Sequence, residues 1–149
     1  MSSTAKFDLE TFLPYQLAVL ATKTSREFAQ IYAAEFGLTI PEWRVLAHLS
    51  QSQNVSVREI HTRVDMDKSK VTRAVQRLAA SKHVKKIQNP KDRRLVSLSL
   101  TAKGRNVIRQ LAPKADTFAQ DLLADLSPAQ KDTFRATVAK LIDTHSKTE

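Results

Sequence analysis

The strongest chemical signal in the sequence is a polar, basic face on the helix predicted over residues 68–82. Four apolar residues have the i, i+3, i+4, i+7 spacing of a buried helical stripe: Val71, Ala74, Val75 and Leu78. The remaining outward side chains are hydroxyls, an amide and cations: Lys68, Ser69, Lys70, Thr72, Arg73, Gln76 and Arg77. Arginine can pair with guanine edges in the major groove of DNA, glutamine with adenine, and threonine can contact the thymine methyl group. The pattern therefore predicts a helix that reads the major groove.

An exposed helix held by surface salt bridges is the alternative interpretation of this face. Such a helix needs acidic residues among the cations, and residues 68–82 contain none. Ser69 lies near the expected N-terminus of the helix, where a hydroxyl and free backbone N–H groups are suited to a phosphate. The composition of the face therefore favours DNA binding.

A second basic cluster occupies the tip of a predicted hairpin, at Lys91, Asp92, Arg93 and Arg94. Three cations in one turn repel one another unless an anion lies nearby. Asp92 can form a salt bridge that orients one arginine, and Arg94 held in this way suits the negative potential of a narrow minor groove. A solvated charged turn is the alternative, but the position directly after a basic helix favours DNA contact.

The net charge is concentrated in the same part of the chain. The 149 residues carry a formal charge of +9. Residues 58–105 contain 14 basic and 4 acidic residues, a net of +10, whereas the rest contains 10 basic and 11 acidic residues, a net of −1. Such a block indicates a polyanionic partner, with a solvated basic face as the alternative. Charge alone gives nonspecific affinity for DNA, so a nonspecific architectural DNA-binding protein is the rival function. The cluster of Thr72, Arg73 and Gln76 argues against this rival.

The elements around the basic helix have the outline of a helix-turn-helix. Thr39 with Glu42, and Ser56 with Glu59, have the spacing of capping boxes, and Asp67 is placed to cap the helix that follows it. Two short helices joined by a turn of a few residues make a helix-turn-helix. The interior residues alone leave any other helical hairpin open.

Alternating apolar residues replace the helical period between residues 83 and 100. Val96, Leu98 and Leu100 alternate with serines, which predicts a half-buried strand, and residues 83–88 are a weaker partner strand. Asn89-Pro90 favours a turn between the two strands. A hairpin with a basic tip is therefore expected directly after the helix pair.

Long apolar stripes flank this region. The helix predicted over residues 14–36 carries its stripe at Leu13, Leu17, Leu20, Phe28 and Ile31. The helix after Thr39 is expected to carry a stripe at Trp43, Leu46, Ala47 and Ser50. The next predicted helix is capped by Thr101, and Pro113 is expected to bend it. The last predicted helix begins at Ser127. The first helix and the last two carry more apolar surface than a small winged domain covers, which predicts a homodimer.

Three segments resemble the MarR family of bacterial transcription regulators: residues 37–49 (GLTIPEWRVLAHL), 69–78 (SKVTRAVQRL) and 92–104 (DRRLVSLSLTAKG). The resemblance implies a mainly α fold with a small β-hairpin wing, in one domain over residues 1–149. A winged helix-turn-helix over about residues 39–100 would lie between dimerisation helices over about residues 10–36 and 102–146. The resemblance also implies an obligate homodimer, a pseudo-palindromic operator in double-stranded DNA, and repression relieved by a small ligand.

The same resemblance implies roles for individual residues. Arg94 would enter the minor groove and Asp92 would steer it. Recognition-helix positions are occupied by Ser69, Lys70, Thr72, Arg73 and Arg77. The chain departs from many members at Asn89-Pro90-Lys91, where they have Asp-x-Arg, and at Lys82-His83, where they have glycine. The absence of cysteine excludes the peroxide-sensing branch of the family.

Effectors in this family often bind where the dimerisation helices meet the winged domain. The candidate contacts there are Tyr15, Arg26, Phe28, Trp43, Arg44 and His48. Aromatic walls with a cation suit an aromatic carboxylate or a phenol. Ordinary packing is the alternative: Phe28 and Trp43 as core residues and His48 as a satisfied core histidine. In that alternative Arg44 pairs with Glu42 or Glu35.

Other functional classes find less support. The chain has no cysteine and its four histidines lack metal-ligand spacing, so neither a metal nor another cofactor is expected. Scattered acids, only two glycines and the lack of a phosphate-cradling loop argue against an enzyme. No apolar run approaches the roughly 20 residues of a membrane helix. The first ten residues lack the apolar core of a signal peptide, so a cytoplasmic location and no membrane partner are expected.

Overall fold

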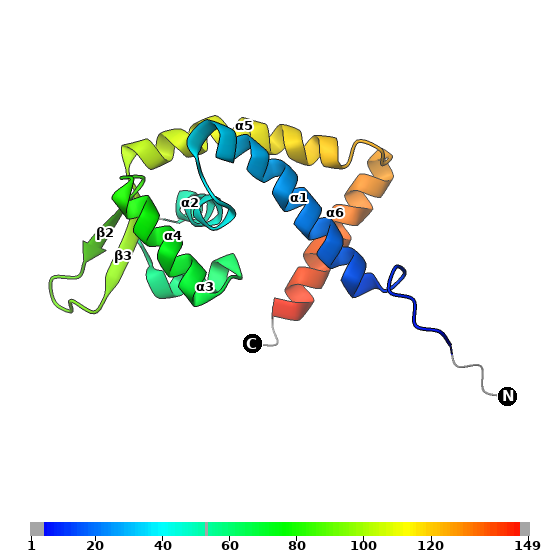
Figure 1. Ribbon diagram of the computed structural model, residues 1–149, viewed down its shortest axis with the longest axis horizontal. Coiled ribbons are helices and arrows are strands. Elements are labelled where there is room, and N and C mark those ends of the chain that lie inside the picture. Colours follow the sequence, from blue (N-terminus) through cyan, green and yellow to red (C-terminus); the bar gives the residue numbers. More distant parts are fainter. Residues whose placement is uncertain (1–4, 53, 147–149) are drawn as a thin grey trace. The chain divides into compact units, whose positions relative to one another are not determined.

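The structure, a computed structural model, describes residues 5–52 and 54–146. This part of the chain is mainly helical, with one small antiparallel sheet (Figure 1). The elements are α1 (Leu13–Phe36), α2 (Ile40–Gln51), β1 (Val55–Ser56), α3 (Val57–Val64), α4 (Lys68–Ala80), β2 (Val84–Gln88), β3 (Val96–Leu100), α5 (Ala102–Leu122) and α6 (Pro128–Ser146). The predicted fold class, a mainly α chain with a β-hairpin wing, is confirmed.

The chain divides into two compact units, Met1–Pro113 and Lys114–Glu149. The first unit contains α1 to α4, the sheet and the beginning of α5. The second contains the end of α5 and all of α6. Helix α5 continues through Pro113, at which the two units divide. Among the described residues, no helix has both the length and the apolar character required to cross a bilayer.

Helix α1 begins and ends as its sequence predicts. A proline stands in its first turn, and Gly37 ends it in the left-handed conformation with φ +65°, donating its N–H to Ala33 O. Only Phe28 and Tyr32 of this helix are buried. The other predicted stripe positions, Leu13, Leu17, Leu20 and Ile31, are exposed or only partly buried. The N-terminal half of the apolar face therefore lies open in this chain.

Helix α2 starts at the predicted capping box. The N–H of Glu42 donates to Thr39 Oγ1, and the N–H of Thr39 donates to Glu42 Oε2, each at 3.4 Å. The predicted interior stripe is only partly confirmed: Leu46 is buried, Trp43 and Ala47 are half-buried, and Ser50 is exposed. The buried residues are Glu42, Val45, Leu46 and Leu49.

Helices α3 and α4 form the predicted helix-turn-helix, with weaker caps than expected. Ser56 Oγ accepts the N–H of Glu59 at 3.1 Å and donates its own proton to Glu59 Oε1 at 3.2 Å. The reciprocal bond of a capping box is replaced by this side-chain contact. Asp67 stands at the N-cap of α4, but its side chain makes no capping bond, so that prediction is wrong. The backbone between the helices turns at Asp65, with φ 51°.

The sheet has the order β1-β3-β2, with all pairs antiparallel. The predicted hairpin is present, and its register pairs Val84 with Leu100 and Gln88 with Val96. Strand β1 was not predicted, because two residues are too short to show alternation. Val55 of β1 pairs with Leu98 and is buried with it. The winged region thus closes around one apolar core.

The start of α5 is fitted closely against the turn between α4 and β2. Thr101 Oγ1 donates to Lys82 O at 2.6 Å and accepts the N–H of Gly104 at 3.1 Å, which confirms the predicted cap. A Cβ at Gly104 would overlap the carbonyl oxygen of His83. Only glycine fits there, because helix and turn approach each other through their backbones.

Candidate nucleic-acid interface

The core stripe of α4 is buried as predicted. Val71, Ala74, Val75 and Leu78 are each at most 2% exposed. The residues facing away from this stripe are exposed, apart from half-buried Thr72: Lys68, Ser69, Lys70, Arg73, Gln76 and Arg77. Helical geometry places Ser69, Arg73 and Gln76 most nearly opposite the core. The burial of α4 therefore leaves one polar face available to a partner.

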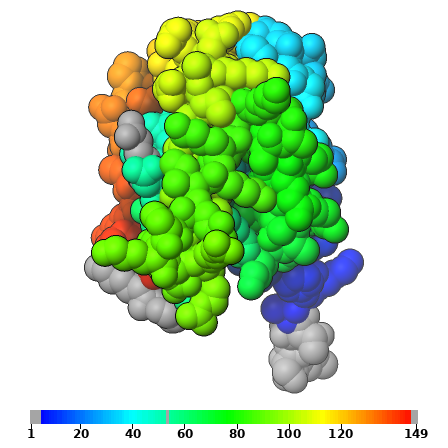
Figure 2. Space-filling view, turned by 90° about the vertical axis from the view of Figure 1, so that its left-hand side faces the viewer, coloured from blue at the N-terminus to red at the C-terminus, as the bar shows by residue number. Residues whose placement is uncertain are grey.

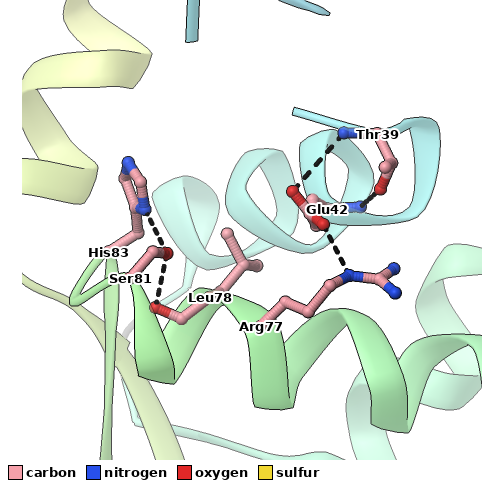
Figure 3. Close-up of polar contacts among 6 residues, drawn as sticks. All are labelled: Thr39, Glu42, Arg77, Leu78, Ser81 and His83. Atoms are coloured by element: carbon pink, nitrogen blue, oxygen red, sulfur yellow. Dashed lines mark hydrogen bonds and ion pairs between the residues drawn. The ribbon is translucent and has the colours of Figure 1, made fainter. Parts of the chain in front are cut away.

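Arg77 is partly committed to the interior of the protein. Its Nε donates to Glu42 Oε1 of α2 at 2.7 Å, and the side chains of Arg77 and Glu42 are 53% and 9% exposed (Figure 3). The predicted alternative partner of Glu42 was Arg44, and the structure replaces it with Arg77. The pair links α4 to α2, although the two residues are 35 positions apart in the sequence. No local sequence pattern could have revealed it.

The predicted pair at the wing tip is present. Asp92 Oδ1 accepts two hydrogen bonds from Arg94. The backbone N–H of Arg94 donates at 3.0 Å, and its side-chain Nε–H donates at 3.3 Å. The Arg94 side chain is 91% exposed despite this contact. The carboxylate therefore orients the guanidinium without burying it, which leaves its N–H groups free for an anion.

Local hydrogen bonds fix the turn that carries this pair. Asn89 Oδ1 accepts the N–H of Lys91 at 2.9 Å and that of Asp92 at 3.3 Å. Gln88 Nε2 donates to Arg93 O at 2.8 Å. The asparagine was predicted as a turn residue, whereas the contribution of Gln88 was missed. These bonds connect the residues of the basic tip to one another and to the end of β2.

The outward face of α4 and the wing lie beside each other in the first unit (Figure 2). Seven cations on these two elements have no acidic partner among residues 5–52 and 54–146: Lys68, Lys70, Arg73, Lys85, Lys86, Lys91 and Arg93. Unpaired cations grouped in this way create a positive potential at the surface. The arrangement is suited to a polyanion that is contacted by a helix and a hairpin together.

The predicted ligand residues are brought together only in part. The rings of Phe28 and Trp43 meet edge to face with centroids 5.2 Å apart. Tyr32 completes the cluster, stacking on Trp43 at 5.5 Å. Burial raises the pKa of the Tyr32 phenol, and the charge of Arg44 opposes this increase. Tyr32 was missed, although its position one helical turn after Phe28 was a signal for it.

The remaining predicted ligand residues lie in different surroundings. Tyr15 is exposed near the start of α1, 13 positions from Phe28 and therefore about 20 Å away along the helix. Arg26 is also exposed, and Arg44 is half-buried. His48 is half-buried on α2, where burial and the charge of Arg63 lower its pKa. The structure does not assemble the six residues into one site within this chain.

Similarity to known sequences covers the winged region and extends beyond it. Residues 36–95 match the sequence profile of the MarR family. The transcriptional regulator TtmR of Methylorubrum extorquens is 34% identical over 110 residues, which cover 72% of this chain and 56% of the relative. BilQ of Clostridioides difficile is 35% identical over 63 residues, which cover 42% of this chain and 43% of the relative. The chain thus spans about half the length of these two relatives.

Solved structures resemble the chain over most of its length. A MarR/EmrR-family regulator from Acinetobacter sp. ADP1 is 25% identical with a TM-score of 0.83, covering 95% of this chain and all of its own. PcaV of Streptomyces coelicolor, solved with its natural ligand, is 26% identical with a TM-score of 0.74, covering 93% of this chain and 97% of its own. BpsR of Bordetella bronchiseptica, whose DNA binding is regulated by 6-hydroxynicotinic acid, shares the fold at 24% identity and a TM-score of 0.72, covering 85% of this chain and 98% of its own.

Proposed function

The chain belongs to the MarR family, and from this premise we propose that it is a sequence-specific DNA-binding transcriptional regulator. The relatives and solved neighbours named above are transcriptional regulators, not enzymes. One observation carries the proposal: the acid-free outward face of α4 lies beside a wing whose Arg94 is oriented by Asp92. Since its partner is the chromosome, we expect the protein to act in the cytoplasm.

In this proposal each element contacts one groove of the DNA. The outward face of α4 lies in the major groove, where Arg73 and Gln76 contact base edges. The wing lies over the adjacent minor groove, where Arg94 enters and Lys91 and Arg93 contact phosphates. Thr72 is half-buried and contributes its methyl group at the edge of the contact.

We propose that two chains form a homodimer through the helices at both ends, residues 10–36 and 102–146. No residue of α6 between Pro128 and Ser146 is buried in the single chain. Its large apolar side chains are exposed, as are those of the first half of α1: Leu13, Leu17, Leu20, Phe134, Val138, Leu141 and Ile142. Each is worth about 1.5–3 kcal/mol when fully buried. A two-fold dimer would place the recognition helices about 34 Å apart, which requires a pseudo-palindromic operator.

We propose that the protein is a repressor released by a small ligand. The regulation of BpsR by 6-hydroxynicotinic acid and the natural ligand of PcaV support this in relatives of the same fold. An aromatic carboxylate or phenol would suit the ring cluster of Phe28, Tyr32 and Trp43 beside Arg44. A thermal-shift screen with phenolic and indolic acids, followed by a DNA-release assay, tests this. Lack of stabilisation by every such acid would exclude this effector class.

Footprinting on the DNA that flanks the gene tests the regulator proposal itself. We expect one protected interval that contains an inverted repeat. Its protection should persist when a scrambled duplex of equal length is added as competitor. Uniform protection would instead indicate the nonspecific architectural protein that the charge alone allows. The comparison is made at moderate salt, where nonspecific phosphate contacts are weakened.

A further inference from the structure

A groove of about 1140 Å³ lies between α3, the start of α4 and the wing. Its lining includes Arg58, His61 and Thr62 of α3, Lys68 of α4, and Arg94 of the wing. The groove therefore lies between the two elements to which DNA binding has been assigned. Arg58, His61 and Thr62 are not among the residues predicted from the sequence to contact DNA.

The charge in this groove is predominantly positive. Arg58 and Lys68 have no acidic partner in the described part of the chain. The only acid in the lining, Glu59, is engaged by Arg63 at 3.5 Å and by Ser56 Oγ at 3.2 Å. Uncompensated cations in a groove attract an anion.

His61 is a second, independent sign of a missing partner. Its Nε2 is buried and has no hydrogen-bond partner among the described residues. Buried polar atoms in native proteins almost always have a partner, and an unpaired one is unfavourable. An anionic oxygen that reaches this atom from the groove would provide that partner.

We propose that this groove binds the backbone phosphates of the DNA strand that runs from the major groove at α4 to the minor groove at the wing. The inference rests on the proposed function, because it needs α4 and the wing to contact adjacent grooves. A helix-turn-helix places its first helix across the phosphate backbone. Arg58 and Lys68 supply charge to the phosphates, the hydroxyl of Thr62 supplies a hydrogen bond, and His61 supplies a further donor when protonated.

This assignment makes DNA binding dependent on pH. In the free protein, burial and the nearby charge of Lys68 lower the pKa of His61, so that the ring is neutral near pH 7. The charged groups around it are Arg58 and Glu59 of α3, Lys68 of α4 and Arg94 of the wing. A bound phosphate favours the protonated ring and raises its pKa. Complex formation therefore takes up a proton, and operator affinity rises as the pH falls from 8 to 6.

The matched pair Arg58→Ala and Arg109→Ala tests the phosphate site. Both variants remove one exposed cation, but only Arg58 lines the groove, whereas Arg109 lies on α5. The slope of log Kd against log salt is measured for the operator and for a scrambled duplex. Arg58→Ala is expected to reduce the slope by about one and to weaken both duplexes by the same factor. Arg109→Ala is expected to leave the slope unchanged, with equal melting temperatures confirming that both variants fold.

If the slope of log Kd against log salt were the same for the two variants, the groove would not bind DNA phosphates. This would hold even if the groove bound a small free anion. Lack of operator preference in the parent protein would instead contradict the proposed function, so the two failures are distinguishable. The variant His61→Asn tests whether protonation of His61 causes the pH dependence of DNA binding. The parent is expected to bind the operator severalfold more tightly at pH 6 than at pH 8, and the variant is expected to lose most of this difference. A variant with the parent's pH dependence would remove His61 from the site.

Discussion

Arg77 of α4 donates through Nε to Oε1 of Glu42 on α2 at 2.7 Å, and the Glu42 residue is only 7% exposed. The second carboxylate oxygen of Glu42 accepts the N–H of Thr39 at the start of α2. One buried carboxylate therefore connects the cap of α2 to the helix assigned to the major groove. Arg77 thus differs from Arg73, which has no such partner among the described residues.

Arg77→Ala is expected to destabilise the protein by about 1–2 kcal/mol. Removal of one partner of a fully buried pair costs about 3–5 kcal/mol because a charge is left unpaired. Solvent reaches the exposed half of Arg77, which reduces this cost. Urea denaturation measures the loss. Arg73→Ala is the control, and its free energy of unfolding should stay within about 0.5 kcal/mol of the parent. Equal stability of the two variants would contradict the structural role of the pair.

Asp92→Ala is expected to weaken operator binding by about tenfold, although it makes the protein more positive. Simple electrostatics predicts tighter binding to DNA when an acid is removed. The opposite result is expected here because Arg94 loses the carboxylate that orients it. Fluorescence anisotropy with a labelled operator gives the affinity. Asp125→Ala, which makes the same change in charge between α5 and α6, should not weaken binding. Tighter binding by the Asp92 variant would show that its carboxylate orients nothing.

Acid is expected to destabilise the fold before it protonates most carboxylates. Burial lowers the pKa of His48, His61 and His83 in the folded protein. The unfolded chain, with histidine pKa near 6.5, therefore takes up protons first as the pH falls. The free energy of unfolding should be constant above about pH 7 and should decrease below about pH 6.5. Urea titrations between pH 8 and pH 5 measure this dependence.

His83→Gln is expected to reduce that pH dependence. Nδ1 of the His83 ring lies 2.6 Å from Ser81 Oγ (Figure 3). Burial lowers the pKa of His83, the charge of Lys103 lowers it further, and the charge of Glu42 opposes this decrease. A stability profile that stays flat down to pH 5 in the parent protein would contradict the lowered pKa of the three histidines.

Gly104→Ala is expected to cost about 1–3 kcal/mol of stability, as overpacking typically does. The new Cβ would meet the backbone carbonyl of His83, which cannot rotate away as a side chain can. The start of α5 would have to shift away from the turn after α4. Thermal denaturation measures the loss, and Asn106→Ala at an exposed position of α5 is the control. A fully stable alanine variant would show that helix and turn are not in close contact.

Periodic local patterns predicted much of the fold. The stripe through Val71 and Leu78 and the alternation at Val96, Leu98 and Leu100 are repeated signals, and the structure buries α4 and pairs the hairpin accordingly. The interior face of α2 was only partly predicted because Val45 and Trp43 are both apolar, so the phase of the helix depends on its packing against α4. Such a choice is made by tertiary contacts rather than by the local sequence.

The candidate site was predictable where its residues are neighbours in the sequence. Asp92 and Arg94 are two positions apart, and their pairing follows from the turn itself. The contact between Arg77 and Glu42 joins segments that are distant in the sequence, so no local sequence pattern indicates it. His61 and Arg58 face the wing only after the sheet has formed, so the groove was also invisible in the sequence. Arg58 belongs to the basic segment 58–105, but the net charge of that segment does not indicate where the side chain of Arg58 lies.

Operator affinity of the double variant Arg73→Ala/Arg94→Ala is the most direct test of the account. Each base or groove contact is worth about 1–3 kcal/mol, so the loss of two contacts should lower the affinity at least about thirtyfold while the dimer stays folded. Lys131→Ala/Lys140→Ala removes the same charge from α6 and should bind nearly as the parent does. A folded Arg73/Arg94 variant that holds the operator as tightly as the parent would contradict DNA recognition by α4 and the wing.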